Sequence, residues 1–146
     1  MAGVYAGEDK LTLAEDSLEE AIGKDELAFV PAHPQVAMVL EQKATLQSRR
    51  GDAPAARATL GRARGIMADH FGPDSMAVAA ACTLLGEVEQ RDHRPAAAVA
   101  QYRSALQMVR NAGIAGARFS TAIVTRYAAA LKAMHQPGAA KALLAQ

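Results

Sequence analysis

The sequence predicts an all-α fold in which antiparallel helix hairpins stack side by side as a solenoid. Three observations predict it: apolar residues recur at helical spacing, no segment alternates apolar and polar residues as a half-buried strand does, and one hairpin pattern recurs about every 42 residues. A pattern repeated at a fixed interval is typical of stacked units that bury their apolar faces against their neighbours. The repeat interval therefore predicts a solenoid of stacked hairpins.

The clearest hairpin runs from Ala79 to Ala105 and reads as two short helices joined by a tight turn. Its marker residues recur at helical spacing, with Cys82, Leu85 and Gly86 on the first helix and Ala98, Tyr102 and Ala105 on the second. A shift by one repeat interval finds their counterparts upstream, at Leu40, Ala44, Ala56, Leu60 and Ala63, and downstream, at Val124, Ala128, Ala140 and Leu144. The chain therefore contains an internal repeat.

Small residues mark the place where the two helices of each hairpin touch. Two helices approach closely only where one presents Gly or Ala, and a larger side chain then fills the space beside the contact. The close-approach pairs that we expect, one in each repeat, are Ala44/Ala56, Gly86/Ala98 and Ala128/Ala140. Because the three pairs keep the same register, they support the assignment of all three hairpins.

This pattern resembles the tetratricopeptide repeat, a helix-turn-helix unit of about 34 residues. The additional length here falls between repeats, where residues 71–79 (FGPDSMAVA) and 30–37 (VPAHPQVA) are similar to the linker of the kinesin light chain subclass. The resemblance covers nearly the whole chain. It implies a right-handed α-α superhelix that binds peptides or proteins, with no catalytic residues.

The first partial repeat is expected to span residues 1–32. Residues 10–23 read as the second helix of this unit, because a shift by the same interval aligns Ala14 and Leu18 with equivalent positions of the next hairpin. The residues before them read as the end of the first helix. The chain is thus expected to start inside a repeat.

The second repeat is expected to span residues 33–74. Its first helix follows Pro34, since proline is tolerated in the first turn, and it stops at Gly51. Asp52 is a suitable N-cap for the second helix. That helix ends where Gly72 precedes a proline.

The third repeat is expected to span residues 75–116. Asp74 or Ser75 caps its first helix, the turn lies at residues 91–94, and Pro95 opens its second helix.

The last partial repeat is expected to span residues 117–146. The composition of residues 111–116 (NAGIAG) marks a flexible break before it. A helix then covers residues 118–135, and a final helix of about two turns follows Pro137.

Composition and charge exclude several classes of partner. Sixteen Lys and Arg residues against 15 Asp and Glu give a net charge of +1, which is too balanced to indicate a nucleic-acid surface. No apolar run approaches the roughly 20 residues that a membrane-spanning helix needs. The N-terminal residues lack a signal-peptide pattern and a single Cys fits a reducing compartment, so a cytoplasmic location is expected.

Few residues of this chain could carry chemistry. The four histidines match no metal-ligand spacing, and His93 and His135 occupy equivalent turns that stacked repeats hold about 10 Å or more apart. Cys82 falls at a position that faces the core of its hairpin, where thiols are unreactive. We therefore expect structural or solvated roles for these residues, no metal, no cofactor and no enzymatic activity.

In the family that the chain resembles, the first helix of each repeat lines a concave groove that binds a peptide. By position, the candidate groove residues are Glu41, Gln42, Thr45, Arg49, Thr83, Glu87, Gln90, Arg91, Thr125, Arg126 and Lys132. Glu41, Thr83 and Thr125 depart from the Lys and Asn of the carboxylate-clamp variant, so binding of chaperone tails is not implied.

The charges of these candidate residues suggest the chemistry of the ligand. Four of them are basic and two are acidic, so an acidic or carboxylate-ended peptide is expected to bind, more weakly as salt rises. A solubilising surface explains the same arginines equally well.

Three functions remain open from the sequence. The leading hypothesis is a non-catalytic scaffold or adaptor whose groove binds a peptide or another protein. The second is a self-associating structural segment, because partial terminal repeats leave Leu143, Leu144 and the N-terminal helix without the neighbours that normally cover such helices. The third is a regulatory or sensor module of a larger signalling protein, which a start inside a repeat would suit.

Overall fold

The computed structural model describes residues 16–17, 20, 23 and 33–145. From residue 33 onward the described residues form six α-helices and no strand, as the sequence predicts. These helices are α2 (Pro34–Arg49), α3 (Ala53–Phe71), α4 (Met76–Arg91), α5 (Pro95–Asn111), α6 (Ile114–Ala133) and α7 (Pro137–Leu144). The predicted partial repeat 1–32 lies outside the described residues, apart from four helical positions.

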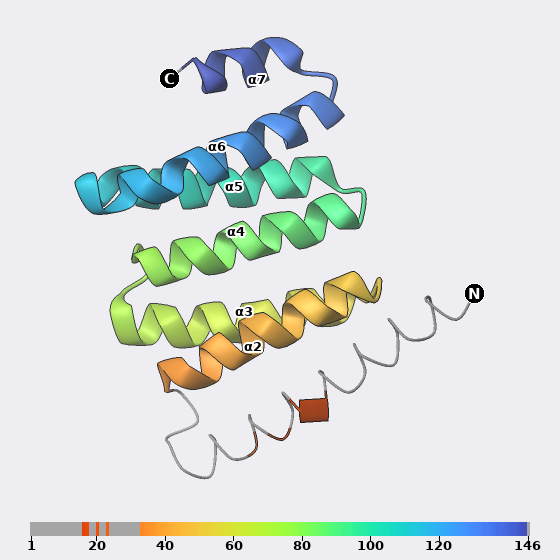
Figure 1. Cartoon of the computed structure of the whole chain (residues 1–146), viewed down its shortest axis with the longest axis vertical. Helices are drawn as coiled ribbons and strands as arrows, with labels where there is room; N and C mark the ends of the chain where they lie inside the picture. The colour runs from red at the N-terminus through yellow and green to blue at the C-terminus, as the bar shows by residue number, and fades with distance from the viewer. Residues whose placement is uncertain (1–15, 18–19, 21–22, 24–32, 146) are drawn as a thin grey trace.

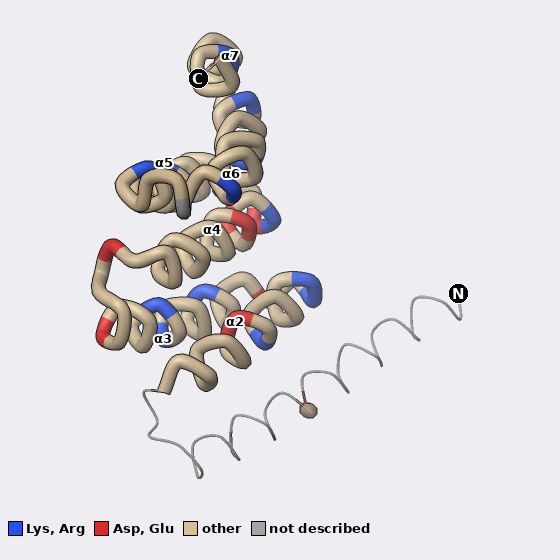
Figure 2. Tube along the Cα trace, turned by 60° about the vertical axis from the view of Figure 1, so that its left-hand side comes forward, with Lys and Arg blue, Asp and Glu red and all other residues tan. Residues whose placement is uncertain are grey.

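The helices stack one on the next from α2 to α7 (Figures 1 and 2). Each helix runs roughly antiparallel to the one before it, so α2 with α3, α4 with α5, and α6 with α7 form three hairpins (Figure 1). The first helices of these hairpins, α2, α4 and α6, also contact one another in that order. One face of the solenoid is therefore built from the three first helices.

Helices α2, α3, α4, α5 and α7 begin with a side-chain cap or a proline, both of which suit a helix N-terminus. The Asp52 side chain accepts a hydrogen bond from the Ala55 N–H at 3.2 Å, and the Ser75 hydroxyl accepts one from the Val78 N–H at 3.3 Å. Of the two caps that the sequence allows for α4, Ser75 is thus the one used. Proline occupies the first turn of four helices, at Pro34, Pro54, Pro95 and Pro137.

The three hairpin turns share one backbone geometry. Gly51, His93 and His135, which lie one repeat apart in the sequence, adopt positive φ angles of 83°, 57° and 59°. The N–H of each donates to the carbonyl three residues earlier, and the next N–H donates to the carbonyl five residues before it. This pair of bonds is the Schellman motif, which ends a helix on a left-handed residue. The two equivalent histidines are therefore turn residues.

The core is built from small residues at the helix contacts and larger side chains beside them. All six members of the predicted close-approach pairs are buried. Gly86 shows why size matters, because a Cβ atom there would overlap the ring of Tyr102, which is itself fully buried. Cys82 is also fully buried, as the sequence predicts.

Helix α6 begins earlier than the sequence predicts. It starts at Ile114, four residues before the predicted position, so residues 114–116 are helical. Gly113, with φ of 65°, supplies the turn between α5 and α6. Gly116 is already part of α6 and lies against α5, where a Cβ atom would overlap the Val109 carbonyl oxygen. These glycines allow close packing.

A cluster of ion pairs joins α3 to α4 across the boundary between two repeats. Arg57 binds Glu89 through two bonds, with Nε 2.7 Å from Oε1 and Nη2 3.1 Å from Oε2, and it also pairs with Asp92. Arg94 lies 3.5 Å from Glu89 on the other side. Because Glu89 is only 6% exposed, its charge depends on these guanidinium groups for compensation. The cluster therefore helps to fix how the two hairpins sit together.

Gly86→Ala is expected to lower the free energy of unfolding by about 1–3 kcal/mol, because the added methyl group must displace the buried Tyr102 ring. Gly65→Ala is the matched control, since no atom lies within 4 Å of a Cβ there and alanine favours the helix by about 0.5–1 kcal/mol. Urea denaturation of both variants measures the difference. Equal stabilities would contradict the close contact between α4 and α5.

His93→Gly is expected to raise the free energy of unfolding by about 0.5–1 kcal/mol. The left-handed conformation costs an ordinary residue about 1–2 kcal/mol, and part of the gain is offset by the greater freedom of glycine in the unfolded chain. The reverse change at the equivalent turn, Gly51→His, should lower stability by a similar amount. Thermal or urea denaturation checks both, and changes of the same sign would exclude a shared turn geometry.

Candidate functional site

A hollow of about 490 Å³ lies between α4 and α6, on the face formed by the first helices of the hairpins. We call it the α4–α6 groove. From α4 it is lined mainly by Met76, Ala77, Ala80, Thr83, Leu84 and Glu87. From α6 it is lined by Phe119, Ala122, Ile123 and Arg126. The groove is thus apolar over most of its length and charged at one end.

Alanines leave the groove open. Ala80 and Ala122 are exposed and occupy equivalent positions on α4 and α6, so neither helix fills the space between them with a long side chain. Phe119 stands at the wall of the groove with 55% of its surface exposed. An exposed aromatic side chain beside an unfilled apolar hollow offers contact area to a ligand.

The charged end of the groove is held by bonds between three helices. The Arg126 Nε lies 2.7 Å from the Glu87 Oε1, which joins α6 to α4. The Gln90 amide donates to the Arg126 carbonyl oxygen at 3.4 Å and accepts a hydrogen bond from the Tyr102 hydroxyl of α5. Burial, and next the negative charge of Glu87, raise the pKa of Tyr102 well above its usual value, so the phenol remains a donor.

The structure brings together some of the predicted groove residues. Thr83, Glu87 and Arg126 line the α4–α6 groove, and Gln90 bonds to its charged end. Thr45 and Arg91 lie at a smaller recess of about 20 Å³ between α2 and α4, which Glu87 also borders.

Other predicted residues lie elsewhere. Gln42 and Arg49 are exposed on α2, and Lys132 is exposed on the last turn of α6. Thr125 lines a second hollow on a different side of α6, next to α5 and α7. The predicted set thus covers more than one surface feature.

The three predicted threonines all use their hydroxyl groups locally. Thr45, Thr83 and Thr125 each donate to the carbonyl oxygen four residues earlier in the same helix, at 3.0, 2.9 and 2.9 Å. Their donors are therefore already engaged.

Sequence reasoning missed the apolar lining of the groove. Met76, Ala77, Ala80, Phe119 and Ala122 were not among the candidates, although Ala77 and Ala80 align with Phe119 and Ala122 after a shift by one repeat. The sequence signal that could have revealed this lining is Phe119, which stands at the repeat position that Ala77 holds in the preceding hairpin.

The described residues contain no arrangement of side chains suited to nucleophilic catalysis or to metal binding. Burial raises the pKa of the Cys82 thiol, and the positive charge of Arg64 opposes this only in part, so the reactive thiolate is disfavoured. No group of three or more His, Cys, Asp or Glu side chains within residues 33–145 and the four earlier positions could hold a metal ion. In the same part of the chain, no helix has the length and apolar character needed to cross a membrane.

Comparison with known proteins identifies the fold. No protein-family model and no curated protein matches the sequence. The crystal structure of BtubC (BKLC) from P. vanneervenii, a kinesin light chain-like tetratricopeptide-repeat protein, is similar over 97% of this chain, with a TM-score of 0.85 and 17% sequence identity. The chain has a tetratricopeptide-like solenoid fold. It spans 57% of the length of BtubC, and at this identity the likeness shows the fold alone.

Glu41 carries a buried polar atom that is unsatisfied among the described residues. Glu41 on α2 is half-buried, and its Oε1 atom is buried without a hydrogen-bond partner among the described residues. Burial raises the pKa of this carboxyl group above its ordinary value. The folded chain therefore holds the Glu41 proton more tightly than the unfolded chain does, and stability falls as pH rises from the unfolded pKa through the folded one.

Glu41→Gln is accordingly expected to raise the melting temperature at pH 7, which lies above the ordinary pKa of glutamate, because the amide cannot carry the charge that burial disfavours. The gain should shrink at pH values below about 4, where the wild-type group is protonated in both states. Asp69→Asn, at an exposed position of α3, controls for the loss of one negative charge. Calorimetry at the two pH values makes the comparison, and a pH-independent gain would rule out the buried carboxylate as its cause.

Proposed function

We propose that this chain is a non-catalytic scaffold or adaptor that binds a peptide segment of another protein in the α4–α6 groove. The observation that carries the proposal is the open apolar hollow itself, about 490 Å³ in volume and bordered by the exposed Phe119. Hollows of this size and apolar character are where proteins most often hold ligands. The expected anchor is an apolar side chain of the peptide, packed between Phe119 and Ile123.

Arginines on the face formed by the first helices favour an acidic peptide. Arg126 is already paired with Glu87, so it adds little net charge to the groove. Arg49 and Arg91 occupy equivalent positions at the ends of α2 and α4, and both are exposed. Carboxylates of a bound peptide could therefore be bound by these two arginines, whose bidentate contacts are among the stronger polar interactions.

The polar groups at the groove support binding more than catalysis. Glu87 pairs with Arg126, the Thr83 hydroxyl donates to a backbone carbonyl, and Gln90 bonds to Tyr102. A nucleophile needs an adjacent base to activate it, and each of these groups is occupied by a structural partner.

The test begins with peptides selected from a random phage-displayed library on the immobilised protein. A selected peptide is then synthesised with a fluorescent label, and its affinity is measured by anisotropy. Ala122→Arg is expected to weaken binding at least tenfold, because its long side chain would occupy the groove. Ala117→Arg is the matched control, an exposed alanine of the same helix that lies outside the groove, and it should change affinity less than twofold.

The same assay tests the preference for acidic peptides. Arg91→Glu should weaken binding of a selected acidic peptide more than Arg64→Glu does, since Arg64 is exposed on the outer helix α3. Raising the salt concentration should weaken binding to the wild type. If selected peptides bind Ala122→Arg as tightly as the wild type, the groove is not the binding site.

A further inference from the structure

The polar side chains that line the α4–α6 groove are already bonded within the chain. Glu87 pairs with Arg126, and the Thr83 hydroxyl donates to the Ala79 carbonyl at 2.9 Å. The other side chains of the lining are those of alanine, leucine, isoleucine, valine, methionine and phenylalanine. Along the groove, a ligand therefore meets mainly apolar side chains, and charged ones only at the end that holds Glu87 and Arg126.

This lining restricts the conformation of a bound peptide. An extended segment presents its backbone N–H and C=O groups to its surroundings, and burying such a group without a hydrogen-bond partner costs free energy. An α-helix pairs these groups internally, so it can bury one apolar face without that cost. Because apolar side chains supply no hydrogen-bond partners, the groove favours a helix over an extended peptide.

The walls of the groove also allow a helix to approach closely. Ala80 on α4 and Ala122 on α6 are exposed and small, and the large Phe119 stands beside them. The buried contact between α4 and α5 combines the same two kinds of residue, a small Gly86 against the large ring of Tyr102. The groove thus presents at its surface the arrangement that packs two helices together inside the hairpin.

The length of the groove sets the length of the helix that fits it. On α4 the lining runs from Met76 to Glu87, which is about 16 Å or three turns of helix at the usual rise per residue. Both walls are complete helices inside the chain, with α4 between α3 and α5 and α6 between α5 and α7. The groove therefore does not depend on where the sequence begins or ends.

The face around the charged end of the groove is basic. The first helices run in the same direction, so their last turns, which carry Arg49, Arg91 and Lys132, lie at the same end of the solenoid (Figure 1). All three side chains are exposed, and no salt bridge joins any of them to an acidic residue in the part of the chain that the structure describes. A helix with acidic residues at this end is therefore complementary in charge.

We propose that the segment bound in the α4–α6 groove is an amphipathic α-helix of a partner protein. Its apolar stripe would span about three turns and pack against Phe119 and Ile123. Acidic residues at one end of the stripe would lie near Arg91. This inference rests on the proposed function of the groove, and it adds the conformation and the chemical pattern of the bound segment.

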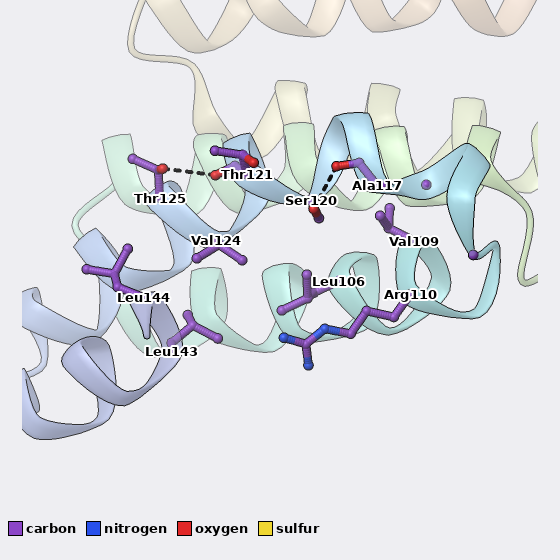
Figure 3. A pocket seen from close by; sticks show the side chains of 12 residues that line it. Leu106, Val109, Arg110, Ala117, Ser120, Thr121, Val124, Thr125, Leu143 and Leu144 are labelled. Carbon is purple, nitrogen blue, oxygen red and sulfur yellow. Dashed lines mark hydrogen bonds between the residues drawn. The ribbon is translucent and has the colours of Figure 1, made fainter. Parts of the chain in front are cut away.

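The test uses a phage-selected peptide whose binding is weakened by Ala122→Arg and not by Ala117→Arg, so that it is known to occupy the groove. Ala117 lines the second hollow, of about 470 Å³, among α5, α6 and α7 (Figure 3). Circular dichroism verifies that both protein variants remain folded, which their exposed positions favour. The Cα chemical shifts of the isotopically labelled peptide, bound to the whole chain, should then be those of a helix over about three turns.

Two variants of the same peptide measure its conformation through affinity. A lactam staple across one helical turn, on the face where alanine substitution is tolerated, should tighten binding about threefold or more, because short helices are marginal alone in water. A proline at a central tolerant position should weaken binding about tenfold or more, because it breaks a helix. Replacing an acidic residue beside the stripe with lysine should weaken binding to the wild type more than binding to Arg91→Glu.

The helical conformation is contradicted if the bound peptide shows the chemical shifts of an extended chain, or if proline is tolerated while the staple abolishes binding. The effect of Ala122→Arg would then still stand, and the groove would remain a site for an extended peptide. If no selected peptide loses affinity with Ala122→Arg, the groove itself is not the site. A wild-type dimer in analytical ultracentrifugation that Ala122→Arg converts to a monomer would assign the groove to a second copy of the chain.

Discussion

The closeness of the two helices in each hairpin is the constraint on which the rest of this solenoid depends. At Gly86 the backbone of α4 approaches the Tyr102 ring so closely that there is no room for a methyl group. That contact buries Tyr102, whose hydroxyl then reaches Gln90, and Gln90 in turn bonds to the Arg126 backbone in the next hairpin. A single small residue thus determines both the packing inside one repeat and the position of the charged end of the groove between repeats.

The fold was accessible from the sequence because small residues and turn residues recur in register, and capping residues or prolines mark several helix starts. The sequence-based predictions failed where one residue type serves two structural purposes. Gly113 and Gly116 read together as a flexible break, yet one supplies a left-handed turn and the other permits contact with the Val109 carbonyl. The Arg57–Glu89 pair could not be found by helical spacing, because its members lie 32 residues apart on helices of different repeats.

The candidate site was accessible only in part. A helix face can be read from spacing, so Thr83, Glu87 and Arg126 were predicted and do line the α4–α6 groove. The hollow exists because no long side chain fills the space between α4 and α6. A sequence shows this only indirectly, through small residues such as Ala80 and Ala122. The pairing of Arg126 with Glu87 likewise depends on the distance between two helices, and it reduces the net charge that the sequence alone suggested.

Helix α6 has a consequence for any regulation of this protein. Residues on two sides of this helix line the α4–α6 groove and the second hollow among α5, α6 and α7, and Val109 of α5 borders both hollows. If a ligand on one side shifts or stiffens α6, the affinity on the other side changes with it, and thermodynamic linkage requires that the effect be reciprocal. Binding at the two surfaces of the last hairpin would then be coupled through α6, so that a ligand on one surface alters the affinity of the other.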